Sequence, residues 1–163
     1  MMLNRVLGLA SILFAMGAAG SASTQETTPW YPPTTGEGDA VRSVYQSRFP
    51  CMDETARALP QCERLKFALA LYHDPSTGRP TRYVMVRVYV GNDDERVIDS
   101  GGWSIVSGTS TDDRAQVIQL DESAPADFRL FWIISDDVIF LLDRDRKPRV
   151  GDAGYGYAVN RTG

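Results

Sequence analysis

The sequence predicts an all-β domain: a small, up-and-down antiparallel barrel of about eight strands. In several short segments apolar residues alternate with other residues, which is the period of a half-buried strand. Turn-forming residues separate these segments at intervals of about 8–12 residues, and no long stretch shows a helical period. Short turns between consecutive strands favour an up-and-down order, and closure into a barrel would remove the exposed sheet edges.

The first 23 residues predict a secretory signal peptide. Arg5 is the only charged residue before Glu26, and residues 6–19 form an apolar run of fourteen residues. The run is shorter than the about 20 residues that span a bilayer, so an uncleaved membrane anchor is the weaker alternative. Small residues follow at 20–23, and we expect cleavage near residues 22–23. Because no cysteine lies near this point, we expect no lipid anchor.

Residues 24–39 are expected to form a flexible tail, because three prolines and two glycines prevent a regular element there. The remaining residues, 40–163, are enough for one domain with a single core. The whole chain carries a formal charge of −4; loss of the one basic residue of the signal peptide leaves 16 basic against 21 acidic residues, or −5. An acidic chain without a basic patch argues against nucleic acid as a partner.

The strands are expected, in chain order, at residues 41–49, 65–72, 82–91, 97–106, 115–120, 128–134, 138–142 and 155–159. The second and third should form a hairpin, because turn formers at 73–78 connect two alternating segments. In the third strand the valines alternate with a face that carries Arg87, so we expect the valines to point inward. Gly101 and Gly102 inside the fourth strand predict a bulge or tight bend, with Trp103 filling the space beside it.

The only two cysteines, Cys51 and Cys62, enclose ten residues between the first two strands. Asp53 is a good N-cap for a short helical turn at 53–59, which Pro60 would end. In an exported chain a disulfide is the expected state, and closing this loop would stabilise the fold by roughly 3 kcal/mol. A redox-active or metal-binding thiol pair is the alternative, although the spacing differs from C-x-x-C.

No catalytic residue can be assigned, and we expect a protein that is not an enzyme. His73 is the only histidine, and no nucleophile can be paired with it from the sequence. The soft ligands Cys51, Met52, Cys62, His73 and Met85 are of the types that select copper(I). Copper is therefore a possible cofactor if the fold brings them together, although methionine usually fills cores.

A set of aromatic residues could line the interior of the barrel: Trp103, Trp132, Tyr155 and Tyr157. Eight-stranded barrels can enclose a small apolar ligand, and these side chains would then bind it. Simple core packing is the alternative. Gly101-Gly102-Trp103 contains the G-x-W of lipocalins, but it lies in the middle of the chain.

Taken together, several motifs make the chain similar to the N-terminal domain of the NlpE-type copper-resistance lipoproteins of the bacterial envelope. They are Tyr45, Phe49-Pro50-Cys51 followed by a second cysteine, the strand 65–71, Tyr83 with 88–91, Ser100 to Trp103, and Leu141 to Asp145. The order and spacing of these motifs, over about residues 40–160, carry the resemblance.

The resemblance implies a lipocalin-like barrel in the periplasm that acts in copper homeostasis or envelope-stress sensing, with an envelope-stress sensor as a possible partner. Cys51 and Cys62 match the family's cysteine pair, which is a C-x-x-C there. This sequence departs from that pattern in three ways: the two cysteines are spaced more widely, the lipobox cysteine is absent, and the chain ends after one domain. The alternatives are a lipocalin-like carrier of a small apolar ligand and an interaction domain that presents the Cys51–Cys62 loop.

Overall fold

The structure is a computed structural model, which describes Pro32 and residues 38–162. The expected signal peptide and nearly all of the expected tail lie outside the described residues. The strands are β1 (Ala40–Phe49), β2 (Arg64–His73), β3 (Pro80–Val90), β4 (Glu95–Ser107), β5 (Gln116–Leu120), β6 (Leu130–Ile133), β7 (Val138–Leu141) and β8 (Ala158–Arg161). Two short helices accompany them: α1 (Glu54–Ala58) and the 3-10 helix η1 (Ala126–Phe128).

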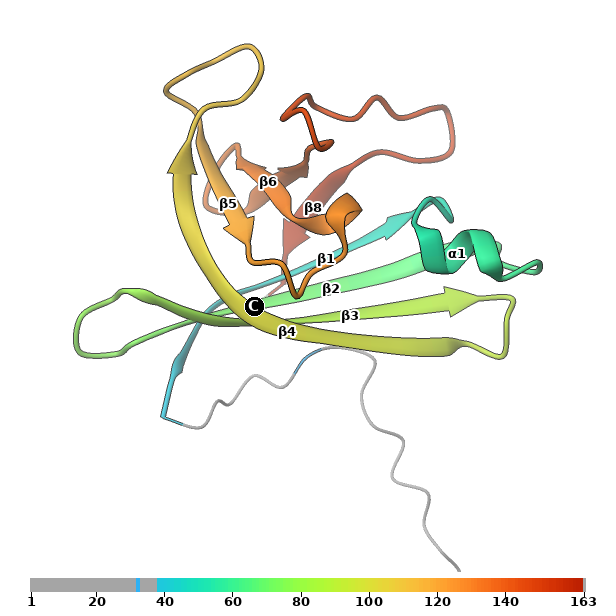
Figure 1. Ribbon diagram of the computed structural model, residues 1–163, viewed down its shortest axis with the longest axis horizontal. Coiled ribbons are helices and arrows are strands. Elements are labelled where there is room, and N and C mark those ends of the chain that lie inside the picture. Colours follow the sequence, from blue (N-terminus) through green and yellow to red (C-terminus); the bar gives the residue numbers. More distant parts are fainter. Residues whose placement is uncertain (1–31, 33–37, 163) are drawn as a thin grey trace, which may run out of the picture.

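The eight strands form a closed antiparallel barrel in which each strand pairs with the next along the chain (Figure 1). The last strand, β8, returns to β1, where Tyr45 lies opposite Arg161 and Gln46 lies opposite Asn160. The predicted fold class and the up-and-down order are therefore confirmed. Among the described residues, no helix is long and apolar enough to cross a membrane.

Strand β4 is strongly curved (Figure 1), and its pairing partner changes just after Gly101 and Gly102. Its first part, 95–102, pairs with β3, and its second part, 103–107, pairs with β5. Oδ2 of Asp121 accepts a hydrogen bond from the Gly102 amide at 2.5 Å. A Cβ atom at Gly101 would collide with the same carboxylate, so the close approach requires glycine there. The bend predicted from the glycine pair is confirmed.

An aromatic cluster fills the half of the barrel next to α1. Phe67 lies at its centre, with ring centroids 5.2 Å from Phe49, 5.5 Å from Phe128 and 5.8 Å from Phe131. All four side chains are fully buried, at 0% exposure. Centroid distances in this range are favourable for aromatic pairs, so this half of the interior is a packed core.

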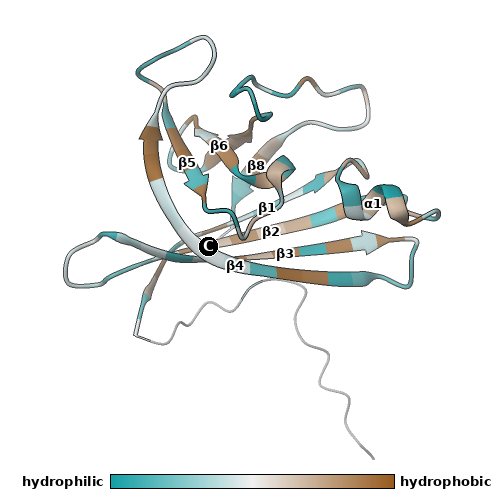
Figure 2. Ribbon diagram, viewed as in Figure 1, coloured by the Kyte–Doolittle hydropathy of each residue, from teal (hydrophilic) through white to brown (hydrophobic). Residues whose placement is uncertain are grey.

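The prediction that the valines of β3 point inward is wrong. Tyr83, Met85 and Tyr89 belong to the inner core cluster, whereas Val84, Val86 and Val88 belong to two separate clusters on the outer face. Arg87 lies on the inner face because buried carboxylates compensate its charge, as described below. Both faces of β3 contain apolar residues, so alternation alone does not identify the inner one. In Figure 2 the ribbon of β3 carries both apolar and polar colours along its length.

Two element boundaries differ from the prediction. The last strand begins at Ala158 rather than Tyr155, and Phe128 belongs to η1 rather than to the start of β6. The helical turn between the cysteines is confirmed. Asp53 is its N-cap, and the Asp53 carboxylate accepts a hydrogen bond from the Ala56 amide at 2.7 Å.

Candidate functional site

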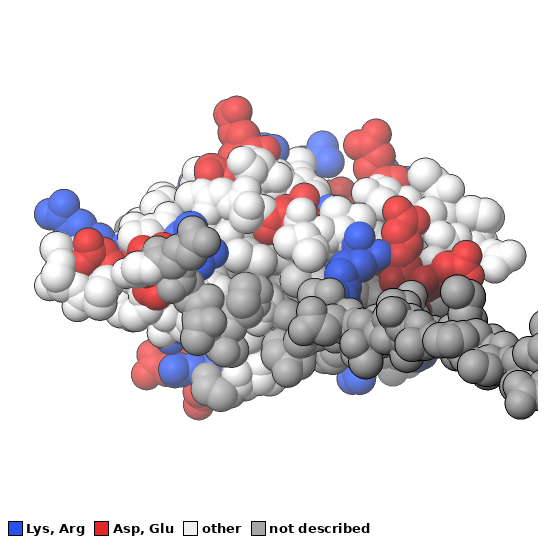
Figure 3. Space-filling model, turned by 90° about the horizontal axis from the view of Figure 1, so that it is seen from below, with Lys and Arg blue, Asp and Glu red and all other residues white. Residues whose placement is uncertain are grey.

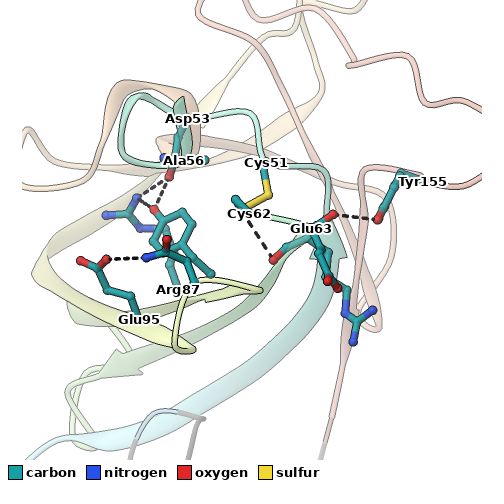
Figure 4. The surroundings of a disulfide bond; sticks show 11 residues. Cys51, Asp53, Ala56, Cys62, Glu63, Arg87, Glu95 and Tyr155 are labelled. Atoms are coloured by element: carbon teal, nitrogen blue, oxygen red, sulfur yellow. Dashed lines mark hydrogen bonds and ion pairs between the residues drawn. A yellow bond between two sulfur atoms is a disulfide. The ribbon is translucent and has the colours of Figure 1, made fainter. Parts of the chain in front are cut away.

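One end of the barrel is covered by a lobe made of α1 and the disulfide (Figure 4). Cys51 and Cys62 are bonded to each other, with their Cα atoms 6.1 Å apart, which confirms the predicted disulfide. Both sulfurs are therefore oxidised, and neither is available as a thiolate ligand in this state. Ala56 of α1 belongs to the inner core cluster, so the lobe is part of the barrel end.

The lobe is docked on the turn between β3 and β4. Gly91 in this turn has φ +89°, and a Cβ atom there would collide with the backbone oxygen of Gln61. The Glu63 amide donates to the Val90 carbonyl at 2.8 Å. On the other side, the hydroxyl of Tyr155 donates to the Glu63 carbonyl at 3.4 Å. The disulfide loop is thus held in place by backbone contacts from β3 and by the C-terminal loop.

A buried ion pair lies directly beneath the lobe. The guanidinium of Arg87, with a side chain 3% exposed, pairs with the Asp53 carboxylate, which is 2% exposed (Figure 4). The same guanidinium donates to Asp99 Oδ2 at 2.9 Å. Tyr89 completes the network, because its hydroxyl donates to Asp53 Oδ2 at 2.6 Å. Asp53 thereby joins the start of α1 to the inner face of β3.

The surroundings of this network favour the charged form of Arg87 and the protonated form of Tyr89. Burial by itself lowers the pKa of Arg87, but Tyr89, Asp99 and Asp53 outweigh it, so the net pKa is raised. Burial, together with the hydrogen bond to Asp53, raises the pKa of Tyr89. The guanidinium is charged and the phenol is neutral at any physiological pH, so the network is structural rather than a proton-transfer site.

A cavity of about 380 Å³, which we call the mouth cavity, opens at the end of the barrel opposite the disulfide lobe. Its wall combines apolar residues from β1, β2, β4, β5 and β6 with a polar rim. The apolar residues are Tyr45, Leu71, Trp103, Ile105, Ile118 and Ile133, and the polar ones are Arg42, Ser43, Gln116, Ser135, Asp136 and Arg161. The volume lies within the range of small-molecule sites, roughly 300–1,000 Å³.

The mouth cavity has a fixed aromatic wall and a positive rim. The indole Nε1 of Trp103 donates to the Tyr72 carbonyl at 2.8 Å, which holds the ring in one orientation. The guanidinium carbon of Arg42 lies 5.9 Å from the centroid of the Trp103 ring. Two arginines and one aspartate at the rim give a net charge of +1. The cavity therefore suits a small molecule with an apolar body and an anionic end.

A wider groove of about 420 Å³ lies between β5, η1 and the loop after β7. The arginines that line it already have partners within the protein. Arg129 donates to the carbonyls of Ala124 and Glu122, and Arg146 donates to the carbonyls of Ser107 and Gly108. We therefore regard the mouth cavity, which reaches the barrel interior, as the better candidate for binding.

The possible copper ligands do not form one cluster. Cys62 precedes the first residue of β2, whereas His73 is its last residue, so the ten-residue strand separates them. The side chain of Met85 lies in the inner core, and Met52 is packed against that core beside Cys51. Among the described residues, no group of three or more His, Cys, Asp and Glu side chains lies close enough to hold a metal.

The four aromatic residues expected in the interior have different positions. Trp103 lines the mouth cavity. Tyr157 lies at the packed end, 5.9 Å from Phe49 between ring centroids. For Trp132 and Tyr155 the expectation is wrong. Trp132 lies between Phe131 and Ile133, which contact the core, so its side chain faces away from the interior. The hydroxyl of Tyr155 donates to the Glu63 carbonyl at the exposed side of the disulfide loop.

Sequence reasoning missed the buried Arg87 and its partly exposed partner Asp99, and gave Asp53 a capping role only. Arg87 is the single charged residue in an otherwise apolar segment, and this isolation could have indicated a buried charge with a partner. A second missed group is Tyr83, whose buried hydroxyl has no hydrogen-bond partner among the described residues. Burial, with repulsion from Asp121, raises the pKa of Tyr83 to about 12.

The fold and these sites define a small closed β-barrel that is sealed at one end by a disulfide lobe and open to a cavity at the other. The family model of the NlpE N-terminal domain matches residues 45–152, about two thirds of the chain. The chain belongs to this family. No curated protein and no solved structure matches it. Membership of an envelope lipoprotein family is consistent with an exported protein.

Proposed function

We propose that this chain is a periplasmic, non-enzymatic barrel protein that acts in copper homeostasis or envelope-stress sensing. The family match carries the proposal, because it covers the lobe, the barrel strands up to β7 and the following loop. The proposal needs no catalytic residue. An envelope-stress sensor is the partner that the family resemblance suggests.

The copper part of the proposal places the metal at the reduced lobe. Cys51 and Cys62 have their Cα atoms only 6.1 Å apart, so two thiolates at these positions would lie close to one another. Met52 is adjacent in sequence and supplies a thioether, and such soft ligands select copper(I). Copper binding at this lobe would therefore depend on the redox state of the cysteine pair.

Titration of the reduced protein with copper(I), against a competing chelator, tests this proposal. We expect one tight site in the wild type and its loss in Cys51→Ser/Cys62→Ser. His73→Ala is the matched control, because His73 lies at the opposite end of β2 and its replacement should leave the affinity unchanged. Equal, weak binding by the wild type and the double cysteine variant would remove the copper role.

The mouth cavity supports a second candidate function, a carrier of a small apolar ligand. Its apolar wall, including Trp103 and Ile118, suits the body of such a ligand, and Arg42 and Arg161 suit an anionic end. The family match does not specify this function. It rests on the cavity of about 380 Å³, since a fully packed barrel could not act as a carrier.

Fluorescence titration with 2-naphthoate and with neutral 2-methylnaphthalene tests the carrier function. We expect tighter binding of the carboxylate and a loss of binding in Ile118→Trp, which fills the cavity. Ile98→Trp is the control, because Ile98 is 57% exposed outside the barrel. Equal affinity of the wild type and Ile118→Trp for both probes would refute a ligand site in the mouth.

A further inference from the structure

The groove between β5, η1 and the loop after β7 differs from the mouth cavity, because three arginines line it. Arg129 follows η1, and Arg144 and Arg146 belong to the loop after β7. Two acidic residues, Asp121 and Glu122, line it as well, so three positive against two negative charges leave a net charge of +1. On the face of the barrel shown in Figure 3, by contrast, the positive side chains lie next to negative ones and form no group of their own.

Two of these arginines are held in place by neutral groups. Nε and Nη2 of Arg129 donate to two backbone carbonyls, at 2.7 and 2.9 Å. Nη1 of Arg146 donates to two others, at 2.9 and 3.1 Å. A carbonyl orients a guanidinium but leaves its charge uncompensated. Neither arginine forms an ion pair with any residue that the structure describes, in contrast to Arg87 and Arg149.

The backbone fixes Arg146 in particular. Its φ of +63° lies in the left-handed region that residues other than glycine rarely adopt. A tight turn maintains this conformation, because Oδ1 of Asp143 accepts hydrogen bonds from the amides of Asp145 and Lys147, at 2.9 and 2.8 Å. The Nε and Nη2 groups of Arg146 have no acceptor among the described residues. They form the edge of a guanidinium that donates two parallel hydrogen bonds to an oxyanion.

The acidic residues of the groove do not pair with these arginines. The two carboxylate oxygens of Asp121 accept hydrogen bonds from the amides of Gly102 and Ser123, at 2.5 and 3.0 Å. The Gly102 amide is the main cause that lowers the pKa of Asp121, and Arg129 is a minor one. The Asp121 carboxylate therefore serves the bend in β4. Glu122 is exposed, so solvent screens its charge.

We propose that this groove binds the phosphate group of a small phosphomonoester. Guanidinium groups can approach the tetrahedral phosphate from more than one direction, whereas a planar carboxylate offers only two oxygens. Arg129 and Arg146 hold the phosphate, and Arg144, with a side chain 69% exposed, contacts it from the rim. The volume of about 420 Å³ and the apolar lining residues Ala126 and Leu130 leave room for an organic body. The inference is independent of the copper and carrier functions.

Calorimetric titration of the expected mature chain, residues 24–163, tests the ligand class with phenyl phosphate, inorganic phosphate and benzoate. The titration is made at low ionic strength and about pH 8, where a phosphomonoester carries close to two charges. We expect phenyl phosphate to bind most tightly, because benzoate keeps the ring but lacks the tetrahedral group. Inorganic phosphate that binds as tightly as phenyl phosphate would assign the groove to the free ion. Absence of phosphate binding, or benzoate as tight as phenyl phosphate, would overturn the proposal.

Variants locate the bound phosphate. Arg146→Lys keeps the charge but loses the paired donors, and should weaken phenyl phosphate binding about tenfold. Arg144→Gln, at an exposed position, should weaken it about threefold. Glu122→Gln should tighten binding, which a misfolded variant would not do. Arg79→Gln is the control for loss of a positive charge, because Arg79 is exposed in the turn between β2 and β3.

The same titration separates the groove from the mouth cavity. Loss of phenyl phosphate binding in Arg161→Gln, with unchanged affinity in Arg146→Lys and Glu122→Gln, would place the phosphate at the mouth cavity and overturn the proposal. Urea unfolding of each variant shows whether its fold is intact.

Discussion

Replacing Asp53 with alanine tests whether the buried network holds the lobe on the barrel. The carboxylate caps α1, accepts a hydrogen bond from Tyr89 and pairs with Arg87. The cap contributes about 1 kcal/mol and the neutral hydrogen bond about the same. Breaking a buried ion pair costs about 3–5 kcal/mol, because a buried charge is left behind.

These contributions do not add, and Arg87 keeps Asp99 at 2.9 Å as a second partner. We therefore expect Asp53→Ala to lower the free energy of unfolding by about 3–5 kcal/mol. Asp53→Asn should cost less, because asparagine keeps the cap but loses the charge. Combining Asp53→Asn with Arg87→Met should recover part of the loss, since the fully buried guanidinium is no longer left without Asp53 and the Asp99 carboxylate, 17% exposed, is left in contact with water.

Urea unfolding of the oxidised proteins at pH 7 measures these differences. The matched control is Asp94→Asn, because the Asp94 side chain is 60% exposed and 4.0 Å from Lys66, and asparagine tolerates the φ of +50° at this position. We expect the control to change stability by less than about 0.5 kcal/mol. A loss below about 1 kcal/mol in Asp53→Ala, with the disulfide intact, would refute the stabilising role of the network.

Four further predictions concern Trp103, Tyr83 and Gly91. Trp103→Ala should cost about 3–5 kcal/mol in urea unfolding, because the indole is 6% exposed; a loss below about 1 kcal/mol would contradict its burial. Tyr83→Phe should be neutral or stabilising at pH 7, because the hydroxyl has no described partner, and a clear destabilisation would reveal a missed hydrogen bond. Burial raises the pKa of Tyr83 from about 10 to about 12, so the folded protein holds this proton more tightly than the unfolded chain and loses stability as the pH rises from 10 to 12. Tyr83→Phe should make the unfolding midpoint less sensitive to pH in this window, and an unchanged slope would contradict the shift. Gly91→Ala should destabilise the oxidised protein, because its Cβ would collide with Gln61, whereas Gly156→Ala, with open space around it, should not.

Local patterns were sufficient to predict the strands, their order and the disulfide. The hairpin of β2 and β3 follows from two alternating segments with turn formers between them, and the bend in β4 follows from two adjacent glycines. Closure of the barrel was expected on general grounds, because an open sheet leaves two exposed edges. The pairing of β1 with β8 joins residues more than a hundred positions apart, so no local pattern specifies its register.

The site was predicted less well because it depends on distances between remote residues. Arg87 and Asp53 are 34 positions apart, and only the fold shows that they compensate one another. Without that pair, a charge on one face of β3 indicated an outward face, and the valines were assigned to the wrong side. The possible copper ligands had suitable chemistry, but the length of β2 separates His73 from the cysteines. Trp103 was placed correctly because it directly follows the glycine bend.

The two hydrogen-bonded ladders of β8 are much shorter than the ladder between β1 and β2. Strand β8 shares two register pairs with β1 and three with β7, whereas β1 and β2 share nine. Transient opening of the cylinder should therefore begin at this seam, and the backbone amides of β8 should exchange with solvent before those of β2. Local opening of the barrel is thus expected along β8, from Arg161 at the rim of the mouth cavity toward the loop that supports the disulfide lobe.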